Sequence, residues 1–356
     1  MTLLRTYIVL AVLRGVATVM VVLLAVTCVI EFVGQLNDVG TGDYGLQTAL
    51  LYIGLRMPGR IFTTLPIGAL IGALLSLGNL AVHRELVVMR ASGVSSLQLL
   101  SAVGLGGLVL AVLMVLLGES VAPSLGAYAS EMRTRAMHEE IAVGDGQATW
   151  LREGDRIVAL RRQAGDLGYG GGVLLFELGP DQSLREVASA DSADLDAANR
   201  WVLSNYAETS FEPGGVAVRT SRESSEAHGI NPDLLELSVV RADLLDTPSL
   251  VRYISYLREN GLDAHRYLVA YWSRLASVFS VVVMTVLALP FVFGGLRSAG
   301  AGARLLVGLI MGLTYYVTVQ VLESGGEVYR LDPLVIAWAP SVLLVLATTI
   351  AFARIR

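Results

Sequence analysis

The most informative absence in this sequence is lysine. All 26 basic residues of the 356-residue chain are arginines, and the single cysteine is Cys28. A Walker A loop needs a lysine that reaches the β- and γ-phosphates, so the sequence contains no ATP site of that type. If the protein performs uphill transport, the energy must come from a partner or from an ion gradient.

Signatures of catalysis and metal binding are also missing. His138, His228 and His265 are scattered, and none stands four residues from another histidine as in a common zinc motif. No Gly-x-Ser-x-Gly nucleophile elbow occurs either. We therefore expect no cofactor, no metal and no enzymatic reaction from this chain.

Long hydrophobic runs are abundant. The chain is 54% hydrophobic and 16% charged, with a mean hydropathy of +0.62, and a span of the bilayer core needs roughly 20 apolar residues. Six apolar runs approach or meet that length, and they predict an α-helical integral membrane protein with about six transmembrane helices. The runs lie near residues 8–33, 61–82, 97–122, 268–293, 305–322 and 334–353.

The third and fourth runs are separated by a segment with an ordinary soluble composition. We predict helices 1–3 in residues 1–123, a water-facing domain in 124–266 and helices 4–6 in 267–356. Between Gln147 and Arg222, short alternating runs broken by Gly-Asp, Pro-Asp and Pro-Gly-Gly indicate antiparallel hairpins, as in a jelly-roll-like all-β domain. An amphipathic helix is predicted from Pro248 to Asn260, with Thr247 as its cap.

Arginines in short loops predict the orientation, because cytoplasmic loops carry the positive excess. We expect both termini and the connector near residues 83–93 on the cytoplasmic side, and the large domain on the other side. The arginines in question are Arg5, Arg14, Arg84, Arg90, Arg297, Arg304, Arg354 and Arg356.

Small residues recur at four-residue spacing in two spans, at Gly68, Gly72 and Ser76 and at Gly308 and Gly312. Such spacing lets helices approach closely in lipid. It fits packing within this chain or an interface with a partner, and the sequence leaves both open.

The connector between the second and third spans is a candidate for energy coupling. Intramembrane charges are few and lie near helix ends, which favours a partner ATPase over an ion gradient. In "HRELVVMRASG", Leu86, Met89 and Arg90 can share one helical face, and Gly93 ends the turn. The alternative is an ordinary charged connector.

At this connector the chain resembles a known family, the YjgP/YjgQ permeases of the lipopolysaccharide exporter, across nearly its full length. The resemblance lies in "FVGQL", "LPIGALIGALLSLGNLAVHRELVVMRASG", "GESVAP", "RYLVAYWSRL", "FVFGGLRS" and "YYVTVQVL". Within the family, "RELVVMRASG" and "FGGLRS" look more like the LptG branch than the LptF branch.

This resemblance implies a permease subunit in the bacterial inner membrane that works in outer-membrane biogenesis. Its partners would be an LptF-like permease, an LptB-like ATPase dimer and an LptC-like membrane-anchored bridge protein, whose helix packs beside the first span. Lipopolysaccharide would leave the membrane through a cavity between the two permeases and pass along periplasmic β-jelly-roll domains. The family's coupling helix corresponds to Arg84, Glu85, Leu86, Val87, Met89 and Arg90.

Lipid A carries phosphates above several acyl chains, so its cavity needs cations above an apolar lining. The arginines placed for phosphate are Arg56, Arg60, Arg133, Arg135 and Arg274. The residues placed for acyl chains are Phe32, Phe62, Tyr315, Tyr316, Val319 and Leu322. Interfacial snorkelling of the arginines and ordinary helix packing of the aromatic side chains are the alternatives.

One departure from the family concerns the outer end of the first span. Family members often carry lysines there, whereas this chain has Glu31, Asn37 and Asp38. We hypothesise that the arginines of other helices compensate.

Two further functions remain open: an ABC permease for another lipid or a lipoprotein, and a membrane-anchored scaffold or receptor whose β-domain binds a partner.

Overall fold

The computed structural model describes residues 2–138, 148–153, 155–161, 172–179, 181, 183–195, 201–212, 215–224, 242–293 and 300–353. The chain divides into two compact units. A helical unit contains residues 1–39, 45–133 and 265–356, and a second unit contains residues 40–44 and 134–264. The predicted boundaries at 123/124 and 266/267 stay predictions.

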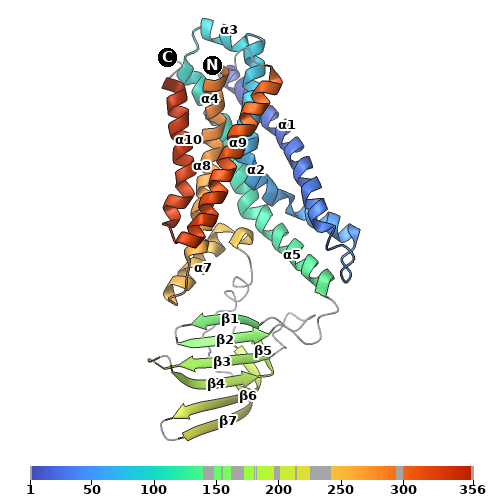
Figure 1. Cartoon of the computed structure of the whole chain (residues 1–356), viewed down its shortest axis with the longest axis vertical. Coiled ribbons are helices and arrows are strands. Elements are labelled where there is room, and N and C mark those ends of the chain that lie inside the picture. Colours follow the sequence, from blue (N-terminus) through green and yellow to red (C-terminus); the bar gives the residue numbers. More distant parts are fainter. Residues whose placement is uncertain are drawn as a thin grey trace. The chain divides into compact units, whose positions relative to one another are not determined.

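Among the described residues, six helical segments are long and apolar enough to cross a membrane (Figure 1), which confirms the predicted fold class. The third segment is α4 continued through the π-helical turn η1 into α5. The segments are α1 (Thr2–Gln35), α2 (Leu46–Val82), α4 (Ser96–Leu116) with η1 (Leu117–Val121) and α5 (Ala122–His138), α8 (His265–Phe293), α9 (Ala301–Tyr329) and α10 (Pro333–Ala353).

The core of the helical unit is built on α2 and α8. In their most apolar windows, 67% of the residues of α2 and 61% of those of α8 are buried, against 17% for α1 and 11% for α9. Buried side chains such as Leu74, Val103 and Leu287 join α2, α4 and α8 in one cluster. The helices α1 and α9 are therefore peripheral, with broad apolar faces open to lipid or to a partner.

The small residues of α2 and α9 serve contacts within this chain. A Cβ added to Gly15 of α1 would lie 2.6 Å from the Gly72 oxygen, and one added to Gly308 would lie 3.1 Å from Ile71. Gly68 faces Met20 of α1, and Gly312 faces Ile67 of α2. Of the two alternatives for this spacing, the structure therefore selects close helix packing inside the chain.

Polar contacts also join the membrane helices. Ser280 of α8 and Ser341 of α10 are fully buried, and their hydroxyl oxygens lie 2.8 Å apart in a hydrogen bond. Ser341 also donates to the Ala276 carbonyl at 3.4 Å. These bonds satisfy two hydroxyls that would otherwise be buried without partners.

The second unit contains an antiparallel sheet of seven strands within the described residues (Figure 1). The strand order is β1-β2-β3-β4-β6-β5, and β7 pairs with β6. This agrees with the predicted hairpins. The strands are β1 (Ala148–Glu153), β2 (Arg156–Arg161), β3 (Val173–Leu178), β4 (Leu184–Ala190), β5 (Ser192–Leu195), β6 (Trp201–Glu212) and β7 (Gly215–Ser224).

Alternating burial explains why these short runs form a sheet. Val173 and Leu175 of β3 and Ala188 and Ala190 of β4 are buried, while residues between them are more exposed. Period-two burial places the buried set on one face of the pleat. The turn between β3 and β4 is closed by the Asp181 carboxylate, which accepts a hydrogen bond of 2.7 Å from the Ser183 hydroxyl.

The second unit also contains the predicted amphipathic helix, α7 (Thr247–Glu259), after the short 3₁₀ turn η2 (Ala242–Leu244). The cap, however, is Asp246, whose carboxylate accepts from the Ser249 amide at 3.2 Å. Thr247 was wrong as the cap because it is itself the first helical residue, and the Asp246 carboxylate before it satisfies an amide of the first turn. Gly261 follows the helix with φ +65°.

Candidate functional site: a connector helix and an arginine cluster

The connector between the second and third spans folds as a helix of its own, α3 (Glu85–Ala91). Arg84 separates it from α2 with a left-handed φ of 60°. Gly93 has φ +91°, its amide donates to the Arg90 carbonyl at 3.1 Å, and the Val94 amide donates to Met89 at 3.1 Å. These two bonds form a Schellman motif, so α3 ends at the predicted glycine.

The apolar residues of α3 divide between two sides. Leu86 is 2% exposed and belongs to the main core, and Met89 packs against the same core. Val87 and Val88 are 41% and 62% exposed. Leu86 and Met89 therefore anchor α3 to the membrane helices, while the two valines are accessible.

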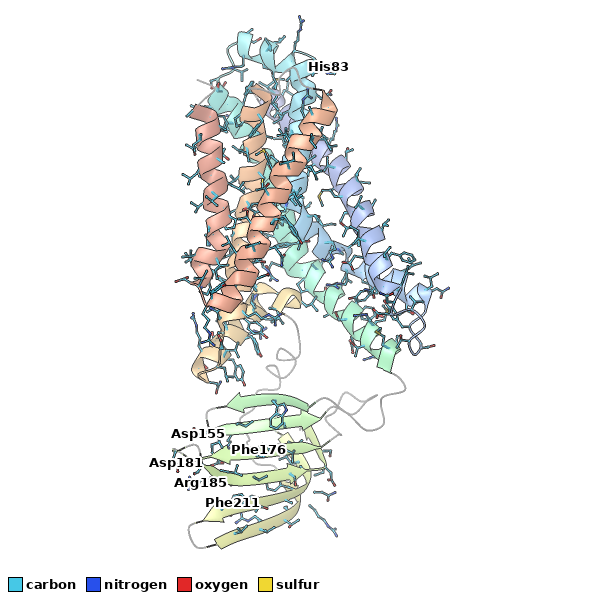
Figure 2. The ribbon with its side chains drawn as sticks, in the orientation of Figure 1. His83, Asp155, Phe176, Asp181, Arg185 and Phe211 are labelled. Carbon is cyan, nitrogen blue, oxygen red and sulfur yellow. The ribbon has the colours of Figure 1, made fainter. Side chains whose placement is uncertain are left out.

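The polar residues of α3 contact other elements. Glu85 accepts a hydrogen bond of 2.7 Å from the Tyr7 hydroxyl of α1. The Arg90 guanidinium lies 5.2 Å from the ring centre of Phe293 and donates to the Ser96 hydroxyl at 3.1 Å. The ends of α1, α4 and α8 thus meet α3. His83 marks the junction of α2 with α3 in Figure 2.

Two of the five arginines predicted to bind phosphate, Arg56 and Arg133, gather around one tyrosine. Arg56 donates to the Tyr52 hydroxyl at 2.8 Å, and the Arg56 and Arg133 guanidinium carbons each lie 5.5 Å from the Tyr52 ring centre. Arg60 follows Arg56 by one turn of α2. We call Arg56, Arg60 and Arg133 the arginine cluster.

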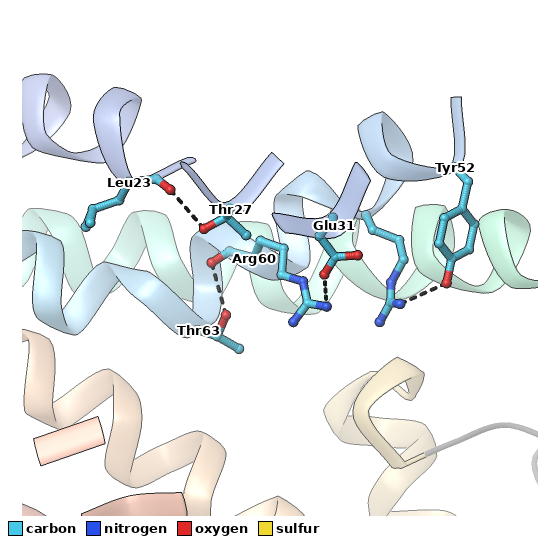
Figure 3. Close-up of polar contacts among 7 residues, drawn as sticks. Leu23, Thr27, Glu31, Tyr52, Arg60 and Thr63 are labelled. Carbon is cyan, nitrogen blue, oxygen red and sulfur yellow. Dashed lines mark hydrogen bonds and ion pairs between the residues drawn. The ribbon is translucent and has the colours of Figure 1, made fainter. Parts of the chain in front are cut away.

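Both acidic residues at the end of α1 are engaged with this cluster. Arg60 forms an ion pair with Glu31, and their side chains point toward each other in Figure 3. Arg133 of α5 donates to Asp38 at 2.6 Å. Arginines of α2 and α5 therefore pair with these two acidic residues, and the compensation for a phosphate role at the first span stays a hypothesis.

The remaining two arginines lie elsewhere. Arg274 of α8 pairs with Glu119 of η1 at 3.6 Å. Next to Glu119, a Cβ added to Gly118 would lie 2.6 Å from the Phe62 ring of α2. Arg135 is exposed on α5. The structure therefore brings together three of the five predicted arginines and leaves Arg274 in a separate ion pair.

The six predicted acyl-chain residues are also divided. Phe32 packs against the small cluster of Tyr52, Ile53 and Ala129, beside the arginine cluster. Phe62 and Tyr315 pack against the main core. Tyr316 is 48% exposed on α9, whereas Val319 and Leu322 are half-buried there. The acyl-chain role of this set stays a prediction.

Sequence reasoning missed two contributors, Tyr52 and Tyr7. The spacing of Tyr52, Arg56 and Arg60 along α2 is a readable signal, since residues four apart share a helical face. No sequence signal pairs Tyr7 with Glu85, which stand 78 residues apart. Among the residues that the structure describes, no group of three or more His, Cys, Asp or Glu side chains could hold a metal ion.

Comparison with known proteins decides the family. The family described as lipopolysaccharide export system permease LptF/LptG matches residues 6–354 of the chain. The chain belongs to the LptF/LptG family. The match covers all six candidate spans and the β-sheet between them, so the family resemblance predicted from the sequence is confirmed.

Individual members of the LptF/LptG family are similar over most of their length. The chain is 33% identical over 321 residues to the lipopolysaccharide export system permease protein LptG of Escherichia coli strain K12, covering 90% of this chain and 89% of the relative. It is 30% identical over 336 residues to LptG of Haemophilus influenzae, covering 94% of each. Family membership and six apolar helices identify a multi-pass protein of the inner membrane.

Proposed function

We propose that this chain is the LptG-type permease subunit of a lipopolysaccharide exporter, powered by a separate ATPase. The observation that carries the proposal is the end-to-end match to the LptF/LptG permeases, with six membrane helices in place. The absence of lysine supports the assignment of ATP hydrolysis to a partner, because the chain has no Walker A loop of its own.

In this proposal α3 is the coupling helix. It lies on the cytoplasmic side with both termini, as the arginines of the short loops predict. Its anchoring by Leu86 and Met89 lets a push on the exposed Val87 and Val88 reach the core directly, since packed interiors transmit strain. Arg84 and Glu85 provide charges beside that surface, and an LptB-like ATPase dimer is the partner that we expect there.

The arginine cluster is proposed to bind the phosphates of lipid A. Guanidinium groups bind phosphate through paired, charge-assisted hydrogen bonds. The three arginines come from two helices, and Tyr52 holds Arg56 and Arg133 in place, which supports a preorganised site. Arg135 and Arg274 are proposed as secondary contacts on the path of the lipid.

The peripheral helices are proposed as the partner surfaces. On α1, Val22, Val26, Val29, Ile30 and Val33 are 55–66% exposed at helical spacing. On α9, Leu306, Ile310, Leu313, Val317 and Val321 are 49–63% exposed. We assign these faces to the LptF-like permease and to the helix of an LptC-like bridge protein, with the β-sheet unit on the periplasmic side.

The test is reconstitution. The chain is coexpressed with the permease, ATPase and bridge proteins of the same bacterium, and ATP-dependent release of lipopolysaccharide from proteoliposomes is measured. Release that requires all components supports the proposal, and no release by a folded complex contradicts it. Glu85→Arg should abolish release, because it reverses the charge beside the exposed face of α3.

Crosslinking tests the phosphate assignment separately. The double variant Arg133→Glu and Arg135→Glu should weaken crosslinking to lipopolysaccharide, whereas Arg185→Glu on the β-sheet unit is a matched control (Figure 2). Unchanged crosslinking in the double variant would remove the phosphate role. A membrane-anchored scaffold, the alternative of another class, would support partner binding without any ATP-dependent release.

A further inference from the structure

Two carboxylates, Glu31 of α1 and Asp38 of the turn that follows it, occupy two of the three arginines of the cluster. Glu31 pairs with Arg60 of α2, with 12% of the glutamate side chain exposed, and Asp38 pairs with Arg133 of α5 at 2.6 Å. Glu31 lies near the end of α1, which stops at Gln35, and Asp38 lies in the turn that follows, where its amide donates to the Gln35 carbonyl at 3.0 Å. The peripheral α1 is thus held near its outer end by ion pairs to two different helices.

We propose that Glu31 and Asp38 are built-in substitutes for phosphate, which a phosphorylated lipid displaces from Arg60 and Arg133, releasing the outer end of α1 from α2 and α5. The inference rests on the proposed phosphate role of the cluster. It adds that two carboxylates pair with the arginines when no lipid is bound. It assigns α1, rather than α2 or α5, as the helix that moves when lipid arrives.

The chemistry of the exchange follows from the ligands. A carboxylate and a phosphate present similar planar pairs of oxygens to a guanidinium, but a phosphate carries a charge of about −1.5 to −2 and a third acceptor oxygen. The Arg60 Nε is buried and makes no hydrogen bond within the described part of the chain. The pair with Glu31 therefore leaves one donor of Arg60 for a ligand with more acceptors.

The charges within the cluster also favour displacement of the carboxylates by phosphate. Arg56, Arg60 and Arg133 supply three positive charges, and Glu31 and Asp38 supply two negative ones, so one positive charge remains among these five side chains. When phosphate displaces the carboxylates, all three guanidinium groups face the ligand. About a third of each side chain of the Arg133–Asp38 pair is exposed, so this pair contributes little to stability. The arginine of the more buried Arg60–Glu31 pair keeps an anionic partner when phosphate replaces the carboxylate.

Arg56 and Arg133 keep their contacts with Tyr52 when α1 leaves. Tyr52 is 4% exposed, and it holds Arg56 through its hydroxyl and both Arg56 and Arg133 beside its ring. These contacts are within α2 and between α2 and α5, and none of them is made by a side chain of α1. Tyr52 is thus the positioning residue of the site.

The outer end of α1 has few other contacts. Ile30 and Val33 are 66% and 58% exposed, and a Cβ added to Gly34 would meet nothing within 4 Å. Cys28 and Phe32 pack against the Tyr52 cluster. By contrast, the Gly15–Gly72 crossing holds the other half of α1 tightly to α2. A pivot near Gly15 with a releasable outer end fits this distribution of contacts.

The experiment removes the two carboxylates without changing side-chain size. The double variant Glu31→Gln and Asp38→Asn is prepared in the complete complex in nanodiscs, and binding of bisphosphorylated lipid A is compared with binding of dephosphorylated lipid A. We expect phosphorylated lipid A to bind the double variant about tenfold more tightly than it binds the wild type, because the two competing carboxylates are gone. Binding of the dephosphorylated lipid should not change.

The matched control is Asp332→Asn. Asp332 caps α10 by accepting from the Leu334 amide at 2.8 Å and lies outside the arginine cluster. Loss of a negative charge at Asp332, away from the cluster, should leave both affinities unchanged. Unchanged or weaker binding of phosphorylated lipid A to the double variant would overturn the inference, since the carboxylates would then not compete with phosphate.

Distances provide a second readout. Spin labels at Val33→Cys and Leu51→Cys, in a Cys28→Ser background, report the separation of α1 from α2. Phosphorylated lipid A should increase this distance in the wild type. In the double variant the distance should already be long without lipid. An unchanged distance overturns the release of α1. If the wild type binds no lipid A, the proposed phosphate site itself fails, which is a different result.

Discussion

The Tyr7 hydroxyl of α1 donates a hydrogen bond of 2.7 Å to Glu85 Oε2 of α3. The same helix reaches Arg60 through Glu31, and the turn that follows it reaches Arg133 through Asp38. A single peripheral helix therefore contacts both the connector and the arginine cluster. Through these contacts α1 joins α3 directly to the arginine cluster.

Tyr7→Phe tests this link. Removing the hydroxyl leaves Glu85 without its donor while the half-exposed ring stays in place. Since a hydrogen bond to a charged group contributes up to about 1.5–3 kcal/mol and exposure reduces it, we expect about threefold less lipopolysaccharide released per ATP hydrolysed. Tyr128→Phe, an exposed tyrosine of α5, is the control. Equal coupling in both variants would show that Tyr7 does not position Glu85.

The two sides of α3 should respond differently to truncation. Leu86→Ala removes a buried side chain, so it should lower stability by about 2–5 kcal/mol in a thermal or denaturant unfolding assay. Val88→Ala changes a residue that is 62% exposed, so stability should be nearly constant. If α3 docks an ATPase, Val88→Asp should reduce ATPase association at normal stability. The opposite pattern would mean that Leu86 is the docking residue.

The crossing of α1 and α2 depends on the absence of a side chain at Gly72. Gly72→Val would place its branched side chain against the backbone of Gly15 and Val16, so the helices must separate. We expect a lower melting temperature and faster proteolysis of the membrane unit. Gly34→Ala on α1 is the control, because nothing lies within 4 Å of the added Cβ. Equal melting of both variants would argue against a close crossing.

The Ser280–Ser341 pair should show coupling in a double-mutant cycle. Either serine replaced by alanine leaves the other hydroxyl with fewer partners in the membrane interior, and the double variant should cost less than the sum of the two. Measured interhelical hydrogen bonds in membranes average about 0.6 kcal/mol, with a maximum near 1.7. If the changes in unfolding free energy of the two single variants add up to that of the double variant, the 2.8 Å contact contributes no stability of its own.

The turn between β3 and β4 should loosen in acid. The hydrogen bond from the Ser183 hydroxyl lowers the pKa of Asp181 below its usual value. A lowered folded-state pKa gives stability that is present above the unfolded pKa and is lost as pH falls through the folded one. Amide exchange at Gly179 and Ser183 should therefore accelerate below about pH 4. Asp181→Asn should remove that pH dependence, and an unchanged pH profile would exclude the carboxylate as its source.

The sequence by itself determined the membrane class, the six spans, the β-rich insertion and the end of α3. Each of these follows from a local property: run length against bilayer thickness, alternation with turn residues, and a glycine that can adopt positive φ. The lack of lysine likewise excluded a Walker A loop without any structure. Family membership follows from motifs spread along the whole chain.

Only the tertiary structure decided which charges meet. It paired Glu31 with Arg60, Asp38 with Arg133 and Tyr7 with Glu85, and it turned the small residues of α2 toward α1 and α9. It also turned Leu86 inward and left Val88 outside. Helical periodicity fixes which residues share a face, but the neighbour of that face depends on how separate helices pack, and this is set by contacts between residues far apart in the chain.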